Sequence, residues 1–297
     1  MCCLFLAASS TVAIAQTNVV DLVNPIIGTN GMGHTFPGAC VPFGLVQLSP
    51  DTDTIPHNVD GKYQPRSYEY CAGYQHKDSS IVGFSHTHFS GTGHSDLGDI
   101  LIMPTTGTLK LNPGTATNPD GGYRSRFSHD TEISRPGYYE VMLADYGVKA
   151  QLTTTQRAGI HKYTYPTNSE NQRIILDMIH GIYNYDGKVL WTNIRVENDT
   201  LVTGYRITNG WARTNYTYFA MSFSKPITHY GCEEKAKVNY RGGYAKFNMK
   251  ENFPDIGGRK IVAYFDFDPK MSDELEVKVA LSGVSTEGAL KNLRAEA

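Results

Sequence analysis

The chain of 297 residues has little net charge, two tryptophans and no long apolar run beyond its first fifteen residues. A formal charge of −2 gives no basic field, so we expect no nucleic-acid partner. A membrane-spanning helix needs roughly 18 or more consecutive apolar residues, so we expect no transmembrane segment. The hydrophobic fraction of 40% and the charged fraction of 19% are typical of a globular protein with a buried core.

Cysteine is also scarce. Two of the five cysteines, Cys2 and Cys3, lie in the apolar N-terminal stretch, which leaves Cys40, Cys71 and Cys232. Three thiols can form one disulfide at most, and no CxxC or Cys/His spacing indicates a zinc finger. We favour buried free thiols over a disulfide.

The N-terminal stretch, residues 1–15, has the features of an export signal. It is apolar (CCLFLAASSTVAIA), and Ala13 and Ala15 before Gln16 fit a small-x-small cleavage site, although a positive first region is missing. We therefore expect a secreted or periplasmic protein, or one held at the cell surface. The alternative is an apolar N-terminus that is buried or unstructured in the mature protein.

Helical periodicity is almost absent from the rest of the chain. Runs that alternate at period two follow one another, split by Gly, Pro, Asn and Asp, and this pattern predicts strands. We therefore predict an all-β fold, a large two-sheet antiparallel β-sandwich over residues 16–284. The predicted strands include GDILIMPTTGTLKL, GYYEVMLADYGVKAQLTTTQ, GIHKYTYP, QRIILDM, GKVLWTNIRVEN, TLVTGYRITNG, NYTYFAMSFSK, GYAKFNMK, KIVAYFDFD and ELEVKVALSG.

A helix is predicted only at the C-terminal end, over residues 285–297. Ser285 can cap it, Glu287 suits its positive first turn, and Leu290 and Leu293 share one face. We interpret it as the start of a linker helix at a domain boundary. The alternative is a terminal helix that packs on the sandwich.

The stretch GFSHTHFSGTGHSDLGD concentrates glycines, histidines and aspartates. If it is extended, period two places His86 and His88 on one face, where they could bind zinc. Two alternatives are a structural histidine cluster and the polar wall of a ligand pocket, and we favour the wall. Further zinc ligands could come from His94, Asp96 and Asp99.

Other catalytic patterns are missing. Ser85, Ser90 and Ser95 lie near histidines, but a nucleophile elbow needs GxSxG between a strand and a helix. The glycine-rich stretch at residues 28–44 lacks the lysine of a phosphate-binding loop. We favour a loop that packs close to a ligand or a second domain, and the alternative is a tight loop whose glycines allow positive φ. Asp96 and Asp99 are close in sequence, but aspartates at such junctions are mostly caps and turn formers.

A hairpin is predicted around the Pro136–Gly137 turn in RFSHDTEISRPGYYEVML. His129 and Glu132 precede the turn, and we expect them to pair across its strands.

Several long motifs together resemble one family, the N-terminal domain of glycoside hydrolase family 92. They are VNPIIGT, GHTFPGACVPFGLVQLSPDT, GFSHTHFSGTG, GDILIMP and RPGYYEVMLADYGVKAQLTTTQRAGIHKY, in the family's order. The family consists of calcium-dependent, exo-acting, inverting α-mannosidases that act on N-glycans and mannans. The resemblance spans roughly residues 19–297.

The resemblance implies a galactose-mutarotase-like sandwich followed by a helical linker and an (α/α)6 barrel. It places the active site between the two domains, with the catalytic carboxylates and most calcium ligands on the barrel. We therefore expect no catalytic residue and no metal ligand in this chain, and no activity from it alone. The implied substrate-binding residues are His34, His86, His88, Ser90, Gly91 and Asp99.

The implied ligand is an α-mannoside glycan, and the implied partner is the barrel domain. Calcium prefers hard oxygen ligands, which argues against His86 and His88 as its ligands. Two other functions remain open: a stand-alone carbohydrate-binding sandwich, and a histidine-dependent metal hydrolase with zinc at these two histidines.

Overall fold

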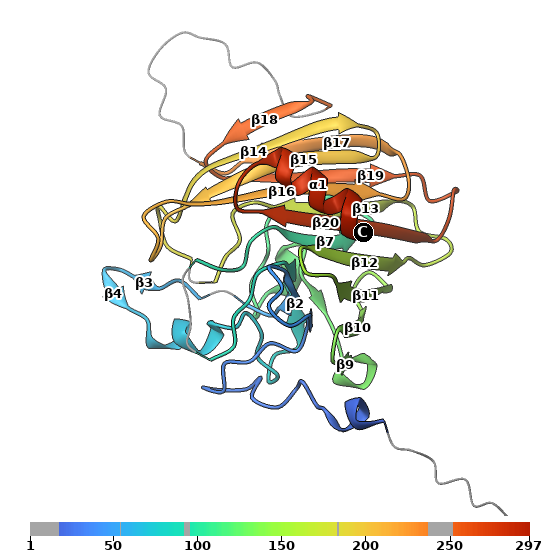
Figure 1. Cartoon of the computed structure of the whole chain (residues 1–297). Helices are drawn as coiled ribbons and strands as arrows, with labels where there is room; N and C mark the ends of the chain where they lie inside the picture. The colour runs from blue at the N-terminus through green and yellow to red at the C-terminus, as the bar shows by residue number, and fades with distance from the viewer. Residues whose placement is uncertain (1–17, 54, 92–95, 183, 237–251) are drawn as a thin grey trace, which may run out of the picture.

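The computed structural model describes residues 18–53, 55–91, 96–182, 184–236 and 252–297. The predicted export signal and the predicted strand GYAKFNMK lie outside the described residues. Within them the fold is a two-sheet antiparallel β-sandwich, as the sequence predicts (Figure 1).

The seven-stranded sheet has strands in the middle whose residues are buried on both faces. Every residue of the central strand β7 and of its neighbour β13 is buried, so both faces of these strands are covered. The spatial order is β1 (Ala39–Cys40), β2 (Gln47–Asp51), β6 (Gly83–Ser85), β7 (Leu101–Thr105), β13 (Gln172–Asp177), β19 (Ile261–Phe267) and β17 (Ile227–Glu234).

The nine-stranded sheet shows the alternation from which the sandwich was predicted. In two of its strands, β10 and β11, buried residues alternate with more exposed ones, because one face meets the core. The spatial order is β18 (Asp255–Gly258), β14 (Val189–Asn198), β15 (Leu201–Thr208), β16 (Asn215–Phe223), β20 (Glu274–Ser282), β12 (Ala158–Thr164), β11 (Val148–Thr154), β10 (Tyr138–Leu143) and β9 (Ile133–Arg135).

Short elements and loops from residues 19–131 gather at one side of the sheets (Figure 1). They are the pair β3 (Asn58–Val59) and β4 (Lys62–Tyr63), the pair β5 (Ser80–Ile81) and β8 (Ser125–Arg126), and the 3-10 helices η1 (Val19–Leu22), η2 (Pro65–Tyr70), η3 (Pro119–Gly121) and η4 (His129–Thr131). One continuous apolar core joins residues of this region, such as Tyr74 and Phe84, to both sheets.

The C-terminal helix α1 (Thr286–Glu296) lies on the outer face of the nine-stranded sheet (Figure 1). Ser285 caps it as predicted, since its side chain accepts a hydrogen bond from the Gly288 N–H at 3.0 Å. The helix buries Ala289 and Leu293 against a row of paired alanines on β12, β20 and β16. Within this chain the helix therefore packs on the sandwich. The row consists of Ala158, Ala280 and Ala220.

The hairpin prediction is right about the turn and, for Glu132, about contact across the strands. Strands β9 and β10 are joined at Pro136–Gly137, where Gly137 has a φ of 75°. The Glu132 carboxylate lies 2.6 Å from the hydroxyl of Tyr139 on β10 and 3.0 Å or less from that of Tyr74, whereas His129 contacts Glu132 itself.

Cys40, Cys71 and Cys232 are free thiols, as predicted, but the prediction that they are buried holds only for Cys71, since Cys40 is exposed and Cys232 is partly buried. Burial raises the pKa of the Cys71 thiol to about 11. Among the described helices, none has both the length and the apolar character needed to cross a membrane.

Candidate functional site at two joined loops

Two loops meet at the N-terminal side of the sandwich. We call residues 28–44 the glycine loop and residues 86–99 the histidine loop. Residues 92–95 of the histidine loop are not among the described residues. His34 joins them: its carbonyl accepts from the Gly91 N–H at 2.8 Å, and its Nδ1 lies 3.0 Å from the Gly91 carbonyl. Both residues have positive φ, 53° at His34 and 110° at Gly91. The two loops are therefore held by reciprocal hydrogen bonds.

The outer edge of this junction is exposed and its base is buried. Phe89, Ser90 and Gly91 face solvent, and Phe43 of the glycine loop is fully exposed. His34 is buried, and its Nε2 has no hydrogen-bond partner among the described residues. A buried ring nitrogen without a partner next to an exposed edge is an open hydrogen-bonding position.

Beneath the loops, one carboxylate binds two histidines. Asp51, at the end of β2, is fully buried; its Oδ1 lies 2.8 Å from His88 Nε2 and its Oδ2 lies 2.7 Å from His180 Nε2. Burial alone raises the pKa of Asp51, but the two imidazoles outweigh that effect and hold the pKa well below its usual range. Asp51 is therefore an anion that anchors the histidine loop to the segment after β13.

The backbone at Gly73 fits closely against this carboxylate. Gly73 has a φ of 82°, and a Cβ placed on it would lie 2.0 Å from Asp51 Oδ1. Any side chain at position 73 would displace Asp51, so glycine is required there for steric reasons.

The contacts of His88 exclude a serine-hydrolase arrangement. Ser85 Oγ lies 3.2 Å from His88 Nε2, the same nitrogen that contacts Asp51. A catalytic triad uses opposite ring nitrogens for its serine and its carboxylate. The other nitrogen, His88 Nδ1, lies 2.8 Å from the Gln47 carbonyl.

A second buried ion pair supports the end of the histidine loop. Asp99 Oδ1 lies 2.7 Å from Arg206 Nη2, and both side chains are buried. The Thr87 hydroxyl donates to Asp99 Oδ2 at 2.9 Å, and Arg206 Nη1 donates to the His180 carbonyl. Asp99 therefore fixes loop and strand together and does not itself reach the surface.

Lys188 is buried beside this ion pair. Its Nζ donates to the Ile182 carbonyl, and desolvation followed by the nearby Arg206 charge lowers its pKa to about 7. The carboxylate of Asp96 accepts from the backbone N–H groups of Trp211 and Ala212, at 2.9 and 3.1 Å. The exposed Trp211 thereby lies next to the histidine loop.

His86 points away from the loops, into the sandwich. Its Nδ1 lies 2.6 Å from the Ile100 carbonyl, its Nε2 lies 3.0 Å from His161 Nε2, and His161 Nδ1 lies 2.8 Å from the Tyr163 hydroxyl. Because the carbonyl can only accept, His86 Nδ1 carries the proton and its Nε2 accepts from His161, which in turn accepts from Tyr163. Burial lowers the pKa of both histidines, that of His86 to about 4, in keeping with this neutral chain.

The predicted site residues thus fall into three groups. His34, Ser90 and Gly91 lie together at the exposed junction; His88 and Asp99 are buried beneath it; His86 lies in the core. Substrate binding by these residues stays a prediction. His86 and His88 do not form the zinc pair considered above, because His86 Nε2 contacts His161 and His88 Nε2 contacts Asp51. Within the described part of the chain, the only set of three possible metal ligands lies elsewhere.

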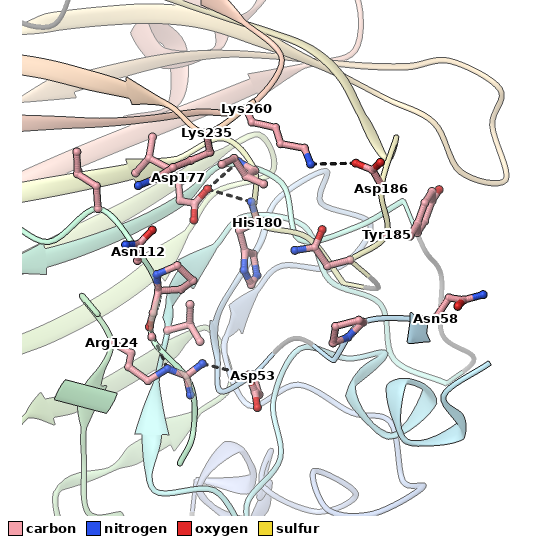
Figure 2. Close-up of a pocket in the computed structure, with 18 residues that line it drawn as sticks. Asp53, Asn58, Asn112, Arg124, Asp177, His180, Tyr185, Asp186, Lys235 and Lys260 are labelled. Atoms are coloured by element: carbon pink, nitrogen blue, oxygen red, sulfur yellow. Dashed lines mark hydrogen bonds and ion pairs between the residues drawn. The ribbon is translucent and has the colours of Figure 1, made fainter. Parts of the chain in front are cut away.

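A polar cavity of about 480 Å³ adjoins the Asp51 network (Figure 2). His180 and Asp177 form part of its wall, Arg124 pairs with Asp53 at one end, and Lys260 pairs with Asp186 at the other. Its volume suits a small ligand. The other charged groups of its wall have partners elsewhere, since Lys235 pairs with Glu233 and Asp177 accepts from the Tyr123 hydroxyl.

Sequence reasoning missed the residues that support the loops. Asp51, His180, Lys188 and Arg206 contact the histidine loop or one another in space, but they lie far from it in the chain. One feature of the sequence could have indicated such a residue. The buried strand QLSPD ends in an aspartate, and a buried carboxylate requires a partner for its charge.

Residues 22–282 match the glycosyl hydrolase family 92 N-terminal domain. The chain belongs to glycoside hydrolase family 92. The family 92 structure of an alpha-mannosidase from Bacteroides thetaiotaomicron, solved with mannoimidazole, is 41% identical with a TM-score of 0.79, over 93% of this chain and 34% of its own. A family 92 inverting mannosidase from Bacteroides thetaiotaomicron is 25% identical with a TM-score of 0.69, over 96% of this chain and 34% of its own.

A curated relative from Arthroderma benhamiae, described as an uncharacterized secreted glycosidase, is 29% identical over 170 residues. That match covers 54% of this chain and 19% of the relative. The chain thus spans about a third of the solved family 92 structures and about a fifth of the curated relative. The resemblance from which the sandwich and the family were predicted is confirmed.

Proposed function

We propose that this chain is the N-terminal domain of a secreted, inverting, calcium-dependent exo-α-mannosidase, and that it completes a mannose pocket whose catalytic carboxylates lie on a barrel domain. Its substrates would be the α-mannosides of N-glycans or mannans. The observation that carries the proposal is the joined pair of loops, with an exposed edge at Ser90 and Gly91 and a buried ionic base. Such a rigid base positions hydrogen-bonding groups for a neutral sugar.

Exposed apolar side chains near the junction support a covering domain. Phe43, Leu45 and Met32 of the glycine-loop region and Phe89 of the histidine loop all face solvent. Apolar groups gathered around a polar edge are typical of surfaces that pack against another domain and a ligand. In the proposed enzyme, the barrel covers these groups and the sugar occupies the space between.

The described residues do not fit calcium. Calcium takes six to eight oxygen ligands, but Asp51 and Asp99 are bound by cationic or imidazole groups and Asp96 by backbone N–H groups. The set of three possible metal ligands in the described part of the chain contains two imidazoles. We therefore propose that calcium is held by residues outside this chain, and we assign it no step here.

The isolated chain should not hydrolyse 4-nitrophenyl α-mannoside, with or without calcium, because no described pair of carboxylates is free to act as acid and base beside the loops. Turnover by the purified chain would refute the division of labour between two domains. Calorimetry with a mannoside tests the alternative function: tight binding by the chain alone would favour a stand-alone carbohydrate-binding module.

Steady-state kinetics of the longest protein that the gene encodes test the role of Ser90 and Phe89 at the exposed loop edge. Ser90→Ala should lower kcat/KM about tenfold, since one lost hydrogen bond costs about 1 kcal/mol or more. Phe89→Ala should lower it as well, through lost contact with the ligand or the covering domain. Thr167→Ala and Phe253→Ala, which change exposed residues away from the loops, are the matched controls. Kinetics equal to those of the controls would remove Ser90 and Phe89 from the site.

A further inference from the structure

Three possible metal ligands converge beside the glycine loop, where the His76 N–H donates to the Thr29 carbonyl at 2.9 Å. His76 precedes β5, His129 begins η4, and Glu132 is the C-cap of η4. One nitrogen from each histidine and a carboxylate oxygen of Glu132 all lie within 4.8 Å of one another. From the sequence, zinc was considered only at His86 and His88, where a polar pocket wall was favoured, and His129 and Glu132 were expected only to pair across strands.

The three side chains are already oriented toward one another. His129 Nδ1 lies 2.6 Å from Glu132 Oε2, and the rings of His76 and His129 lie 3.9 Å apart at their centroids with planes 30° apart. Ligands on one tetrahedral ion with bonds of about 2.0–2.1 Å are about 3.3 Å apart. Small side-chain rotations therefore bring the three atoms to metal distance, with coordination replacing the His129–Glu132 hydrogen bond.

Neighbouring tyrosines fix the carboxylate as supporting residues do in metal sites. The Tyr139 hydroxyl lies 2.6 Å from Glu132 Oε1, and the Tyr74 hydroxyl lies 2.9 and 3.0 Å from the two carboxylate oxygens. The Tyr74 hydroxyl also lies 3.5 Å from His76 Nδ1. Hydrogen bonds of this kind orient a carboxylate ligand and are typical of the surroundings of bound metals.

The exposed side chain of His129 gives a metal ion access to the cluster. The Glu132 side chain is 3% exposed, whereas that of His129 is 38% exposed. A metal can therefore reach the cluster from solvent through His129, while its charge is balanced by a buried carboxylate. Three protein ligands leave a fourth position for water.

We propose that His76, His129 and Glu132 form a site for a divalent transition-metal ion, with zinc as the expected ion. Two imidazoles and one carboxylate suit zinc and do not suit calcium or magnesium, which take oxygen ligands. The ion would tie the segment before β5 to η4, and through Tyr139 to β10. None of the three ligands belongs to the junction of His34, Ser90 and Gly91, and the metal site does not depend on the proposed mannosidase function.

The test uses the purified chain without a histidine tag, stripped with a chelator and then titrated with zinc chloride by calorimetry. We expect one zinc per chain and a rise in Tm at saturating zinc, and no such response to calcium. Cobalt(II) should give the visible absorption bands of a four-coordinate site. Absence of stoichiometric zinc binding by the wild-type chain would overturn the proposal.

Variants of the proposed ligands and of Tyr139 test where the ion binds. His129→Ala and His76→Ala should abolish the Tm rise, and Tyr139→Phe should weaken zinc affinity about tenfold through the carboxylate it supports. His229→Ala is the matched control, because this histidine also lies near a carboxylate, Asp266, at 3.6 Å. Zinc binding that survives both histidine variants would place the ion elsewhere and overturn the assignment. If a variant does not fold, the wild-type cobalt spectrum still tests the site, because the weak bands of a six-coordinate ion would overturn a four-coordinate assignment.

Discussion

At the scale of single residues, burial gives the histidines of this domain different chemical states. His88 and His180 contact a buried anion, whereas His86 and His161 contact each other and neutral groups. The sequence motif HTH therefore contains two histidines with unrelated roles. Sequence could identify the motif, but it could not distinguish the two roles, because the deciding partners Asp51 and His161 come from other strands.

The neutral His86–His161 pair predicts a loss of stability in mild acid. Burial lowers the pKa of His86 to about 4, below the roughly 6.5 of an unfolded histidine, so the unfolded chain binds more protons between these values. The free energy of unfolding should therefore decrease as the pH falls from about 6.5 toward 4, by up to about 1.4 kcal/mol per pH unit for each such histidine.

Urea unfolding between pH 7.5 and pH 5, followed by circular dichroism, measures this dependence. His57→Ala, at an exposed histidine, should leave the slope unchanged. A free energy of unfolding that stays constant across this range would contradict a neutral buried pair.

At the scale of elements, the sequence predicted strands of two kinds. Alternation identifies β10, β11 and β20 because their outer residues face solvent or α1. Continuous apolar runs identify β7 and β13, which are buried on both faces. The prediction missed β2 and β6, which are short and contain Pro50 and Gly83, residues that are typical of loops and bulges.

Helix α1 offers a prediction of its own. Ala289 is fully buried against the row of alanines on β12, β20 and β16, so Ala289→Leu should overpack this contact and lower the free energy of unfolding by about 1–3 kcal/mol. Ala295→Leu, on the exposed face of the same helix, should have little effect. Urea unfolding compares the two, and equal stability would mean that α1 is not docked in solution.

At the scale of the whole molecule, one core connects the N-terminal third to both sheets. Tyr74 and Phe84 belong to the same apolar cluster as Phe219 and Phe265. The loop-rich N-terminal third is therefore part of the sandwich and not a separate unit. Composition and periodicity could predict the fold class, whereas the base of the site depends on long-range ion pairs that no local pattern records.

A shared core predicts a single cooperative unfolding transition. In a Trp191→Phe variant, the fluorescence of Trp211 reports on the region beside the histidine loop, while far-ultraviolet circular dichroism reports on the sheets. The two urea transitions should coincide. A fluorescence change that clearly precedes the loss of strand signal would show that the loops unfold on their own.

The carboxylate of Asp51 also limits how this sequence can change over evolutionary time. Both of its oxygens are engaged, by histidines from two segments, and the backbone of Gly73 closes off a third direction. Replacing Asp51 removes the anion from two buried imidazoles at once, and replacing either histidine leaves the anion short of a partner. Acceptable substitutions here are therefore simultaneous ones. The four positions lie between residues 51 and 180 (Asp51, Gly73, His88 and His180), and we expect them to change together or not at all.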